Sequence, residues 1–393
     1  MKYDLPSPVE LAGSTRTVLL ALAAIGVLAA AAGAFMSPTR MWASWLLVAF
    51  FTLGIGLAGL CFVAIHYATG STWSVAFRRV PEALAATLPF SIGMMAVLFF
   101  AHPQLYGWTT DESLVTDASR RLAFKHFWLS WPFFLLRAAV YSGIWILFGA
   151  LIRQRSRRQD KDGDPRWTHE NFKLSAVFLV LFAITMTLAS FDWLMSLEYH
   201  WFSTIFGVYN FAGLFQSGLA VIILVALWLE RAGPLKNMLR EGHLHDLGKL
   251  LFAFSVFWAY IWFSQYMLIW YTNLPEETSY FIRRTHGAWF VLFILNLFLN
   301  FVIPFAVLLR RDTKGQRQTM AIVAGVVLLG RWLDVYLMVF PGLVGESPTF
   351  GVWELGVTLG GIGAFGLVLA AALKGAPAVP IADPELIESL EYH

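Results

Sequence analysis

The residues of this sequence that could do chemistry are ionisable side chains inside, or at the ends of, long apolar runs. A charge inside a membrane costs at least about 2.5 kcal/mol unless it is paired or hydrated, so such a group should face the interior of the protein. Arg331 and Asp334 lie three residues apart, share one face of a helix and can form an ion pair. The candidate residues are Arg137, Asp192, Glu198, His200, Arg331, Asp334 and Glu354.

Two interpretations of these candidates stay open. In the first, they form structural ion pairs that fix how helices pack. In the second, they form a site for proton transfer or for a polar headgroup. The second interpretation predicts one connected polar cluster in the outer half of the protein, with Asp192 or Glu198 as groups that release protons to water. The expected members of that cluster are Arg137, Arg331, Asp334, Asp192 and Glu354.

The elements that must position these residues are transmembrane helices. The chain of 393 residues is 58% hydrophobic and only 13% charged, whereas a soluble domain carries about 25% charged residues. Apolar runs near 20 residues recur, which is enough for a helix to cross a hydrocarbon layer of about 30 Å. We therefore predict an all-α integral membrane protein with about ten transmembrane helices, at roughly 16–36, 41–67, 81–101, 131–152, 172–190, 203–229, 248–271, 287–309, 318–340 and 351–373.

The distribution of Lys and Arg predicts how these helices are oriented. With both termini on one side, twenty of the 28 Lys and Arg residues fall on that side and six on the other, while Arg137 and Arg331 lie inside spans. An excess of Lys and Arg marks the cytoplasmic side of a membrane protein. Both termini are therefore expected to be cytoplasmic, and the join between the fifth and sixth spans, SFDWLMSLEYHWFSTIFGVYNF, is expected to lie outside.

The loops predict how the chain is divided. Residues 1–152 form a first half with four helices, 153–171 a cytoplasmic loop, 172–373 a second half with six helices, and 374–393 a cytoplasmic tail. The mixed apolar and basic outer loop 102–130 suits a helix that lies at the membrane interface. The acidic, Pro-containing tail is expected to be disordered alone and to become ordered against a partner.

The few cysteines and the positions of the histidines limit which cofactors this chain can bind. One cysteine, Cys61, cannot supply the ligands of an iron–sulfur cluster or a covalent haem c. The histidines lie in loops or at helix ends, so no facing pair is expected at membrane depth for haem b. A metal site made by His200, His286, Asp192 and Glu198 is conceivable, but the spacing of these residues is unspecific. We expect this chain to bind no haem, iron–sulfur cluster, flavin or metal.

Four segments resemble a known family. They resemble the ActF-type membrane subunits of bacterial alternative complex III, a quinol:electron-acceptor oxidoreductase, within the wider NrfD and polysulfide-reductase membrane-anchor family. The resemblance covers nearly the whole chain, and the length and ten spans suit this type better than its longer ActC-type paralogue. The segments are SFDWLMSLEYHWFSTIFGVYNFAG at 190–213, DLGKLLFAFSVFWAYIWFSQYMLIWYTNLPEET at 246–278, RRVPEA at 78–83 and ADPELIESLEYH at 382–393.

The resemblance implies a fold, a location and a set of partners. The family is built from two four-helix bundles with extra helices and lies in the bacterial inner membrane. Its redox centres belong to other subunits: an iron–sulfur and molybdopterin-like subunit and c-type haem subunits on the outer face. The other implied partners are an ActC-like paralogue, lipids and a terminal oxidase, and no nucleic acid is expected.

The resemblance also implies a function. Menaquinol is the implied electron donor, its oxidation is assigned to the ActC-type subunit, and the ActF type is proposed to carry proton half-channels. The chain is then a non-redox subunit that is not catalytic alone, and whether it borders a menaquinol site stays open. The alternative function is that of a stand-alone secondary transporter, since ten to twelve spans are common in that class.

The predicted orientation can be tested by labelling. Single cysteines introduced at residues 191–202 should react with a membrane-impermeant reagent added outside intact cells, because this join is predicted to face outward. Cysteines introduced in the predicted cytoplasmic loop 153–171 should react only after the membrane is opened. The reverse pattern would overturn the predicted orientation.

Overall fold

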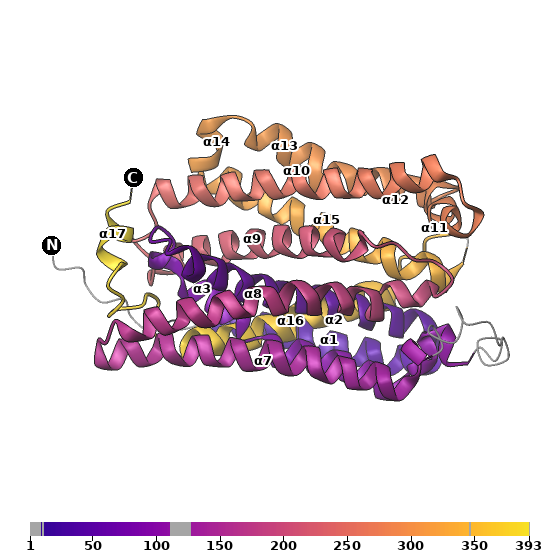
Figure 1. Cartoon of the computed structure of the whole chain (residues 1–393), viewed down its shortest axis with the longest axis horizontal. Helices are drawn as coiled ribbons and strands as arrows, with labels where there is room; N and C mark the ends of the chain where they lie inside the picture. The colour runs from indigo at the N-terminus through magenta and orange to yellow at the C-terminus, as the bar shows by residue number, and fades with distance from the viewer. Residues whose placement is uncertain (1–8, 10–11, 111–126, 346, 393) are drawn as a thin grey trace.

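The computed structural model describes residue 9 and residues 12–110, 127–345 and 347–392 of the chain. Within these ranges ten helices are long and apolar enough to cross a membrane, which confirms the predicted all-α class of a multi-pass membrane protein. Figure 1 shows them side by side. They are α1 (Gly13–Met36), α2 (Pro38–Thr69), α3 and α4 (Arg79–Ala85 and Leu88–Ala101, one span), α7 (Trp131–Asp162), α8 (Arg166–Trp193), α9 (Phe206–Ala232), α10 (Glu241–Thr272), α12 and α13 (Trp289–Leu297 and Ile303–Leu308, one span), α15 (Arg317–Val344) and α16 (Val352–Lys374).

Shorter helices complete the two ends of the molecule. In Figure 1, α11 lies at one end, and α14 and α17 lie at the other. The predicted interfacial helix in the loop 102–130 falls largely on residues 111–126, which lie outside the described residues. The shorter helices are η1 (Val75–Phe77), η2 (Pro103–Leu105), η3 (Gly107–Thr109), η4 (Met195–Glu198), α11 (Pro275–Thr285), η5 (Phe298–Val302), α14 (Arg311–Gly315) and α17 (Leu386–Leu390).

The long helices pack as two groups of four and one extra pair. The first bundle consists of α2, α3–α4, α7 and α8, and the second of α9, α10, α12–α13 and α15. Helix α2 also packs against α9 and α15, so it joins the two bundles, while α1 and α16 form a pair that packs on α2. The pair is close because Gly26 and Gly360 face each other: a Cβ atom on Gly360 would lie 2.2 Å from the Cα atom of Gly26.

The predicted boundary at 153–171 is wrong. Helix α7 continues to Asp162 and α8 begins at Arg166, so most of the predicted loop is helical. No helix breaker occurs in this segment before Gly163, which ends α7 in the left-handed conformation with φ of 68° and is followed closely by Pro165. Helix α8 packs on α7 and α2, so the fifth span belongs to the first bundle rather than to a second half of the chain.

The tail after α16 is ordered against the chain itself, so the expectation that it is disordered without a partner is wrong. Asp383 forms an ion pair with Arg78, and both side chains are buried. The guanidinium of Arg240, at the start of α10, donates a 2.8 Å hydrogen bond to the carbonyl of Leu390. The tail therefore ties the connection after α2 to the connection between α9 and α10, and so links the two bundles at one end.

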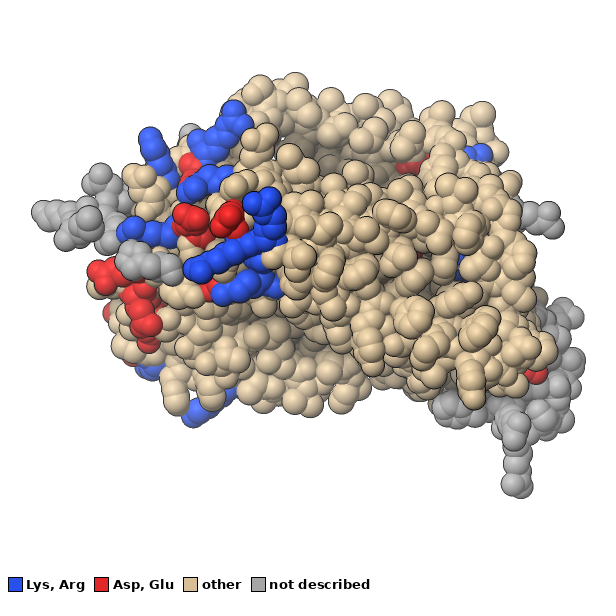
Figure 2. All heavy atoms as spheres, turned by 90° about the horizontal axis from the view of Figure 1, so that it is seen from above, with Lys and Arg blue, Asp and Glu red and all other residues tan. Residues whose placement is uncertain are grey.

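The charged residues are distributed as a membrane-spanning protein requires. Figure 2 shows Lys and Arg gathered at one end of the visible face, the end where α14 and α17 lie, with a long uncharged surface beside them. This surface would contact lipid tails. The gathered positive charge is the feature on which the predicted orientation depends, and the cytoplasmic location of that end stays a prediction.

Candidate functional site

Asp334 of α15 lies in the interior of the second bundle and accepts hydrogen bonds from three other helices. Its predicted ion pair with Arg331 is confirmed, with a distance of 2.6 Å between Nη1 and Oδ2. Asn296 donates to the same carboxylate at 3.0 Å, Trp258 donates at 3.3 Å, and the hydroxyl of Tyr209 also donates to it. The side chains of Arg331 and Asp334 are only 2% and 1% exposed. The carboxylate is therefore held by a full set of donors in an apolar bundle.

The hydrogen bonds of Asp334 continue through Asn296 to a helix interruption that Pro304 causes. Pro304 has no N–H, so it cannot bond to the carbonyl of Asn300 four residues earlier, and the backbone around Asn300 forms a short π-helix. The carbonyl of Asn300 instead accepts a 2.7 Å hydrogen bond from the amide of Gln216 on α9. The side-chain amide of Asn300 donates to that of Asn296 at 2.7 Å. A hydrogen-bonded line thus runs from Asp334 through Asn296 and Asn300 to Gln216.

The line ends near the middle of the bundle. Gln216 lies ten residues into α9, which corresponds to about 15 Å from the end of α9 that is predicted to face outward. Its amide also donates to the hydroxyl of Ser255 at 2.9 Å. The side-chain oxygens of Gln216 and Asn300 are buried and accept no hydrogen bond from the described residues. The line thus ends at mid-depth in two buried acceptor atoms.

A second proline organises the outer edge of the same bundle. Pro341 lies inside α15 and cannot bond to the carbonyl of Leu337. Instead, Arg284 of α11 donates a 2.8 Å hydrogen bond to that carbonyl. The guanidinium of Arg284 also forms a 2.6 Å ion pair with Glu198 of η4 and lies 3.3 Å from the ring centre of Tyr280. Glu198 is 11% exposed and Arg284 only 3%, so Glu198 is the member of this pair that lies nearer to the surface.

A small cavity lies between Asp334 and Arg284. Its volume is about 20 Å³, and Tyr209, Gln265 and Tyr280 also line it; a cavity needs about 10–15 Å³ to hold one water molecule. Burial raises the pKa of Tyr280 above its usual range, although Arg284 opposes the shift, so this phenol stays protonated near neutral pH. Polar groups therefore continue from Glu198 at the outer edge to Asp334 and on to Gln216.

The candidates of the first bundle form a closed pair. Arg137 of α7 and Asp192 of α8 make two 2.8 Å hydrogen bonds to each other. Tyr141 and Trp128 donate to the same carboxylate at 3.1 and 2.9 Å, and the guanidinium lies 4.1 Å from the ring centre of Trp128 and 4.4 Å from that of Phe133. Arg137 is 6% exposed and Asp192 is 1% exposed. This geometry is that of a structural clamp between α7 and α8.

Glu354 lies at a third site, separate from Asp334 and from the pair of Arg137 and Asp192. Its carboxylate, in the first turn of α16, forms two hydrogen bonds of 2.9 and 2.8 Å with Arg40 of α2. Nowhere in the described part of the chain does a hydrogen bond or ion pair connect the three carboxylates Asp192, Asp334 and Glu354. The prediction of one connected cluster is therefore wrong. The position of a residue along its helix, which the sequence does predict, does not say which helix interface the residue faces.

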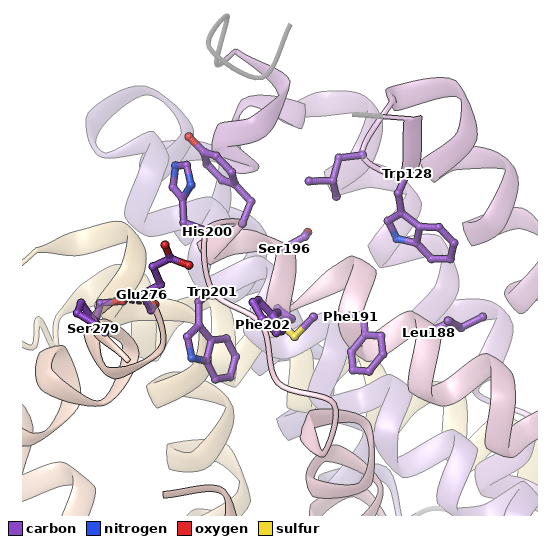
Figure 3. A pocket seen from close by; sticks show the side chains of 13 residues that line it. Trp128, Leu188, Phe191, Ser196, His200, Trp201, Phe202, Glu276 and Ser279 are labelled. Atoms are coloured by element: carbon purple, nitrogen blue, oxygen red, sulfur yellow. Dashed lines mark hydrogen bonds between the residues drawn. The ribbon is translucent and has the colours of Figure 1, made fainter. Parts of the chain in front are cut away.

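His200 lies apart from these pairs, in an open pocket between η4 and α11. The pocket has a volume of about 1000 Å³. In Figure 3, His200, Glu276 and Ser279 lie toward one side of it, and Leu188 and Phe191 lie toward the other. A mostly apolar pocket with a few polar groups suits an amphipathic molecule.

The described residues at the end of the molecule that is predicted to face outward do not form a metal site. Among these residues, no group of three His, Cys, Asp or Glu side chains is placed to hold a metal ion. Of the four residues considered for such a site, Asp192 is enclosed by Arg137 and Glu198 is paired with Arg284, while His200 lines the open pocket. His286 bonds to the carbonyl of Ile282 at 2.9 Å.

Sequence reasoning missed several members of the polar line. The predicted span 287–309 leaves Arg284 outside the membrane helices, but its side chain is buried. Asn296 and Asn300 are four residues apart in an apolar span, a spacing that places both amides on one face. A signal for the missed contacts was present in Pro304 and Pro341, because a proline inside a transmembrane helix leaves a carbonyl that needs another donor.

A scan against models of protein families finds no match to this chain, and a search of curated proteins finds no similar sequence.

The clamp between α7 and α8 predicts a large effect of losing one charge. Arg137→Met leaves the carboxylate of Asp192 buried without its cation, so we expect the unfolding free energy to fall by about 3–5 kcal/mol. Thermal and denaturant unfolding of the purified chain in detergent, followed by circular dichroism, would measure this. Arg310→Met, which removes an exposed cation, serves as the control. The double variant Arg137→Met/Asp192→Leu should recover most of the loss, and a single variant as stable as the parent would contradict the clamp.

Proposed function

We propose that this chain is a non-redox membrane subunit of a quinol-oxidising respiratory complex, similar to the ActF-type subunit of bacterial alternative complex III. In this proposal it anchors redox subunits at its outer face and provides the outer part of a proton path through its second bundle. The proposed location is the bacterial inner membrane, with menaquinol as the electron donor of the complex. The haem and iron–sulfur centres belong to the partner subunits, and electrons continue toward a terminal oxidase.

The segments that carry the resemblance also supply the buried polar contacts. The segment at 190–213 contributes Glu198 and Tyr209, and the segment at 246–278 contributes Trp258. The two inner segments, RRVPEA and the tail, meet through the ion pair of Arg78 and Asp383. Several residues in the segments that carry the resemblance therefore have defined hydrogen-bond or ion-pair partners.

The observation that carries the proton path is the polar line of the second bundle. It begins at Glu198, the partly exposed member of an ion pair, passes the water-sized cavity, and reaches Asp334. From there amide groups continue to Gln216 near mid-depth. Asp334 is the titratable carboxylate at the centre of this line, which makes it the group that would take up and release the proton.

The chemistry required of the line is simple. A proton that reaches Asp334 from the interior neutralises the carboxylate, which weakens its ion pair with Arg331. The hydroxyls of Tyr209 and Tyr280 lie at the cavity and can pass the proton toward Glu198, because a phenol both donates and accepts hydrogen bonds. Arg284 holds Glu198 at the outer end and so keeps the receiving carboxylate in position.

The open pocket beside η4 gives the outer face a second role in this proposal. Its apolar side and its polar residues His200, Glu276 and Ser279 suit either a quinol ring near the interface or a side chain of a docking subunit. A menaquinol site that borders this chain would be placed there. The chain itself contributes contacts to such a site rather than an electron carrier.

One observation favours the alternative, a stand-alone secondary transporter. The span α12–α13 is interrupted by the π-helix at Asn300, and transporters use interrupted helices near the middle of the membrane to bind substrates. The two functions differ in their partners: a transporter is complete alone, whereas the proposed subunit works only beside chains that carry redox centres.

The proton path predicts a specific effect of Asp334→Asn in the assembled complex. Asp334→Asn leaves Arg331 buried without its anion, so we expect a lower yield of assembled complex. The complexes that do assemble should release fewer protons for each quinol oxidised and turn over more slowly. Proton release and quinol oxidation would be measured together in proteoliposomes, since their ratio does not depend on the yield of protein.

Glu354→Gln is the matched control, because Glu354 is an equally buried carboxylate in an ion pair away from the polar line. It should leave the proton-to-quinol ratio unchanged even where it lowers stability. If the Asp334→Asn complex oxidises quinol at the parental rate and acidifies the outside as before, the chain is a scaffold alone.

A further inference from the structure

A second polar pocket lies at the opposite end of the molecule, on the part of α7 that extends beyond its apolar run. It has a volume of about 370 Å³. Four of the six residues that line it are cationic and none is acidic; the lining residues are Ala150, Arg153, Gln154, Arg157, Arg158 and Lys161.

The cations of this pocket are not compensated by the protein. Arg153, Arg157 and Lys161 follow one another at intervals of four residues, so like charges lie along one side of the helix and repel one another. In the described ranges, neither these three nor Arg158 forms an ion pair with a carboxylate. The helix therefore holds a local excess of positive charge.

The acidic residues that could neutralise the pocket are already engaged. Glu82 accepts hydrogen bonds from Arg79 at 2.5 Å and from Ser156 at 2.7 Å. Asp160 is also paired with Arg79. Asp162, four residues after Arg158, accepts a 2.8 Å hydrogen bond from Trp167 and forms no ion pair with the described cations of the pocket. The excess positive charge of the pocket therefore suits an anion from outside the chain.

Two donor atoms of the residues that line the pocket also lack an acceptor in the protein. The Nε atoms of Arg153 and Arg157 are shielded from solvent and have no hydrogen-bond acceptor among the described residues. A buried guanidinium N–H without an acceptor is costly. A phosphate group has several strong acceptor oxygens and suits adjacent guanidinium groups, which bind it in a planar, forked geometry.

The surface beside the pocket indicates which kind of phosphate would arrive there. Leu136, Val140 and Leu147 are 58%, 49% and 54% exposed, and they follow helical spacing along one face of α7. The exposed Ala150 continues this apolar stripe, and Arg158 comes two turns later. Acyl chains packed along the stripe would therefore place a lipid headgroup at the cations.

We propose that this pocket binds the phosphate of an anionic phospholipid in the inner leaflet, with Arg153 and Arg157 as the residues that hold it. Basic pockets at the cytoplasmic ends of transmembrane helices are suited to anionic headgroups. The bound lipid removes the repulsion along α7 and fixes the end of this helix against the tail. This site is independent of the proposed proton path, which lies in the other bundle.

The test is a titration of the purified full chain in detergent with phosphatidylglycerol, followed by thermal unfolding. We expect the lipid to stabilise the parent, and the half-saturating concentration to rise at least about tenfold in Arg153→Gln/Arg157→Gln, since each cation contributes about a few-fold in binding. Arg310→Gln/Arg311→Gln is the control, because it removes two exposed cations near the same end. Its titration should match that of the parent.

Three results would overturn the proposal. The first is equal weakening in the control, which would assign the effect to surface charge in general. The second is equal stabilisation by phosphatidylcholine, or by inorganic phosphate alone, which would exclude an anionic lipid as the occupant. The third is no stabilisation of the parent by phosphatidylglycerol. If Arg153→Gln/Arg157→Gln does not fold, Arg158→Gln/Lys161→Gln changes exposed side chains of the same pocket and should weaken the lipid effect in the same direction.

Discussion

Inside an apolar bundle no bulk water is present, so every carbonyl and every charge must find a partner in the protein, and the rest of this structure depends on that constraint. Two prolines show the effect of this constraint. Pro304 and Pro341 each leave a helix carbonyl without its usual donor, and a polar side chain from another helix supplies one in each case: Gln216 for the first and Arg284 for the second. The helix breaks thus bring polar groups into the second bundle, where they form a line.

The two bundles use buried charge differently. In the first, Arg137 and Asp192 satisfy each other and their aromatic neighbours close around them, which suits a fixed contact between α7 and α8. In the second, Asp334 has donors on three other helices and lines a water-sized cavity that Arg284, the partner of Glu198, also lines. A proton path is therefore expected only in the second bundle, although both bundles carry a carboxylate beside an arginine.

The sequence predicted the class of the fold and part of the site. Long apolar runs identified ten spans, because the thickness of a membrane sets the length of a helix. The spacing of Arg331 and Asp334 identified their pair, because three residues in a helix bring side chains together. Contacts between helices could not be predicted in this way, because the partners of Glu354 and Glu198, which are Arg40 and Arg284, depend on how helices pack. The predicted division of the chain was wrong because α7 and α8 continue as helices beyond their apolar runs.

The proposed function is that of a chain that supports redox chemistry without carrying a redox centre, and the most direct test of this proposal is to isolate the chain from its native membrane. An affinity-tagged chain, purified in mild detergent, should bring with it partner subunits that show c-type haem absorbance and iron–sulfur signals. After these partners are removed, the chain alone should show neither. Isolation of the chain as a single protein with transport activity, or a haem that stays bound to the separated chain, would contradict the account.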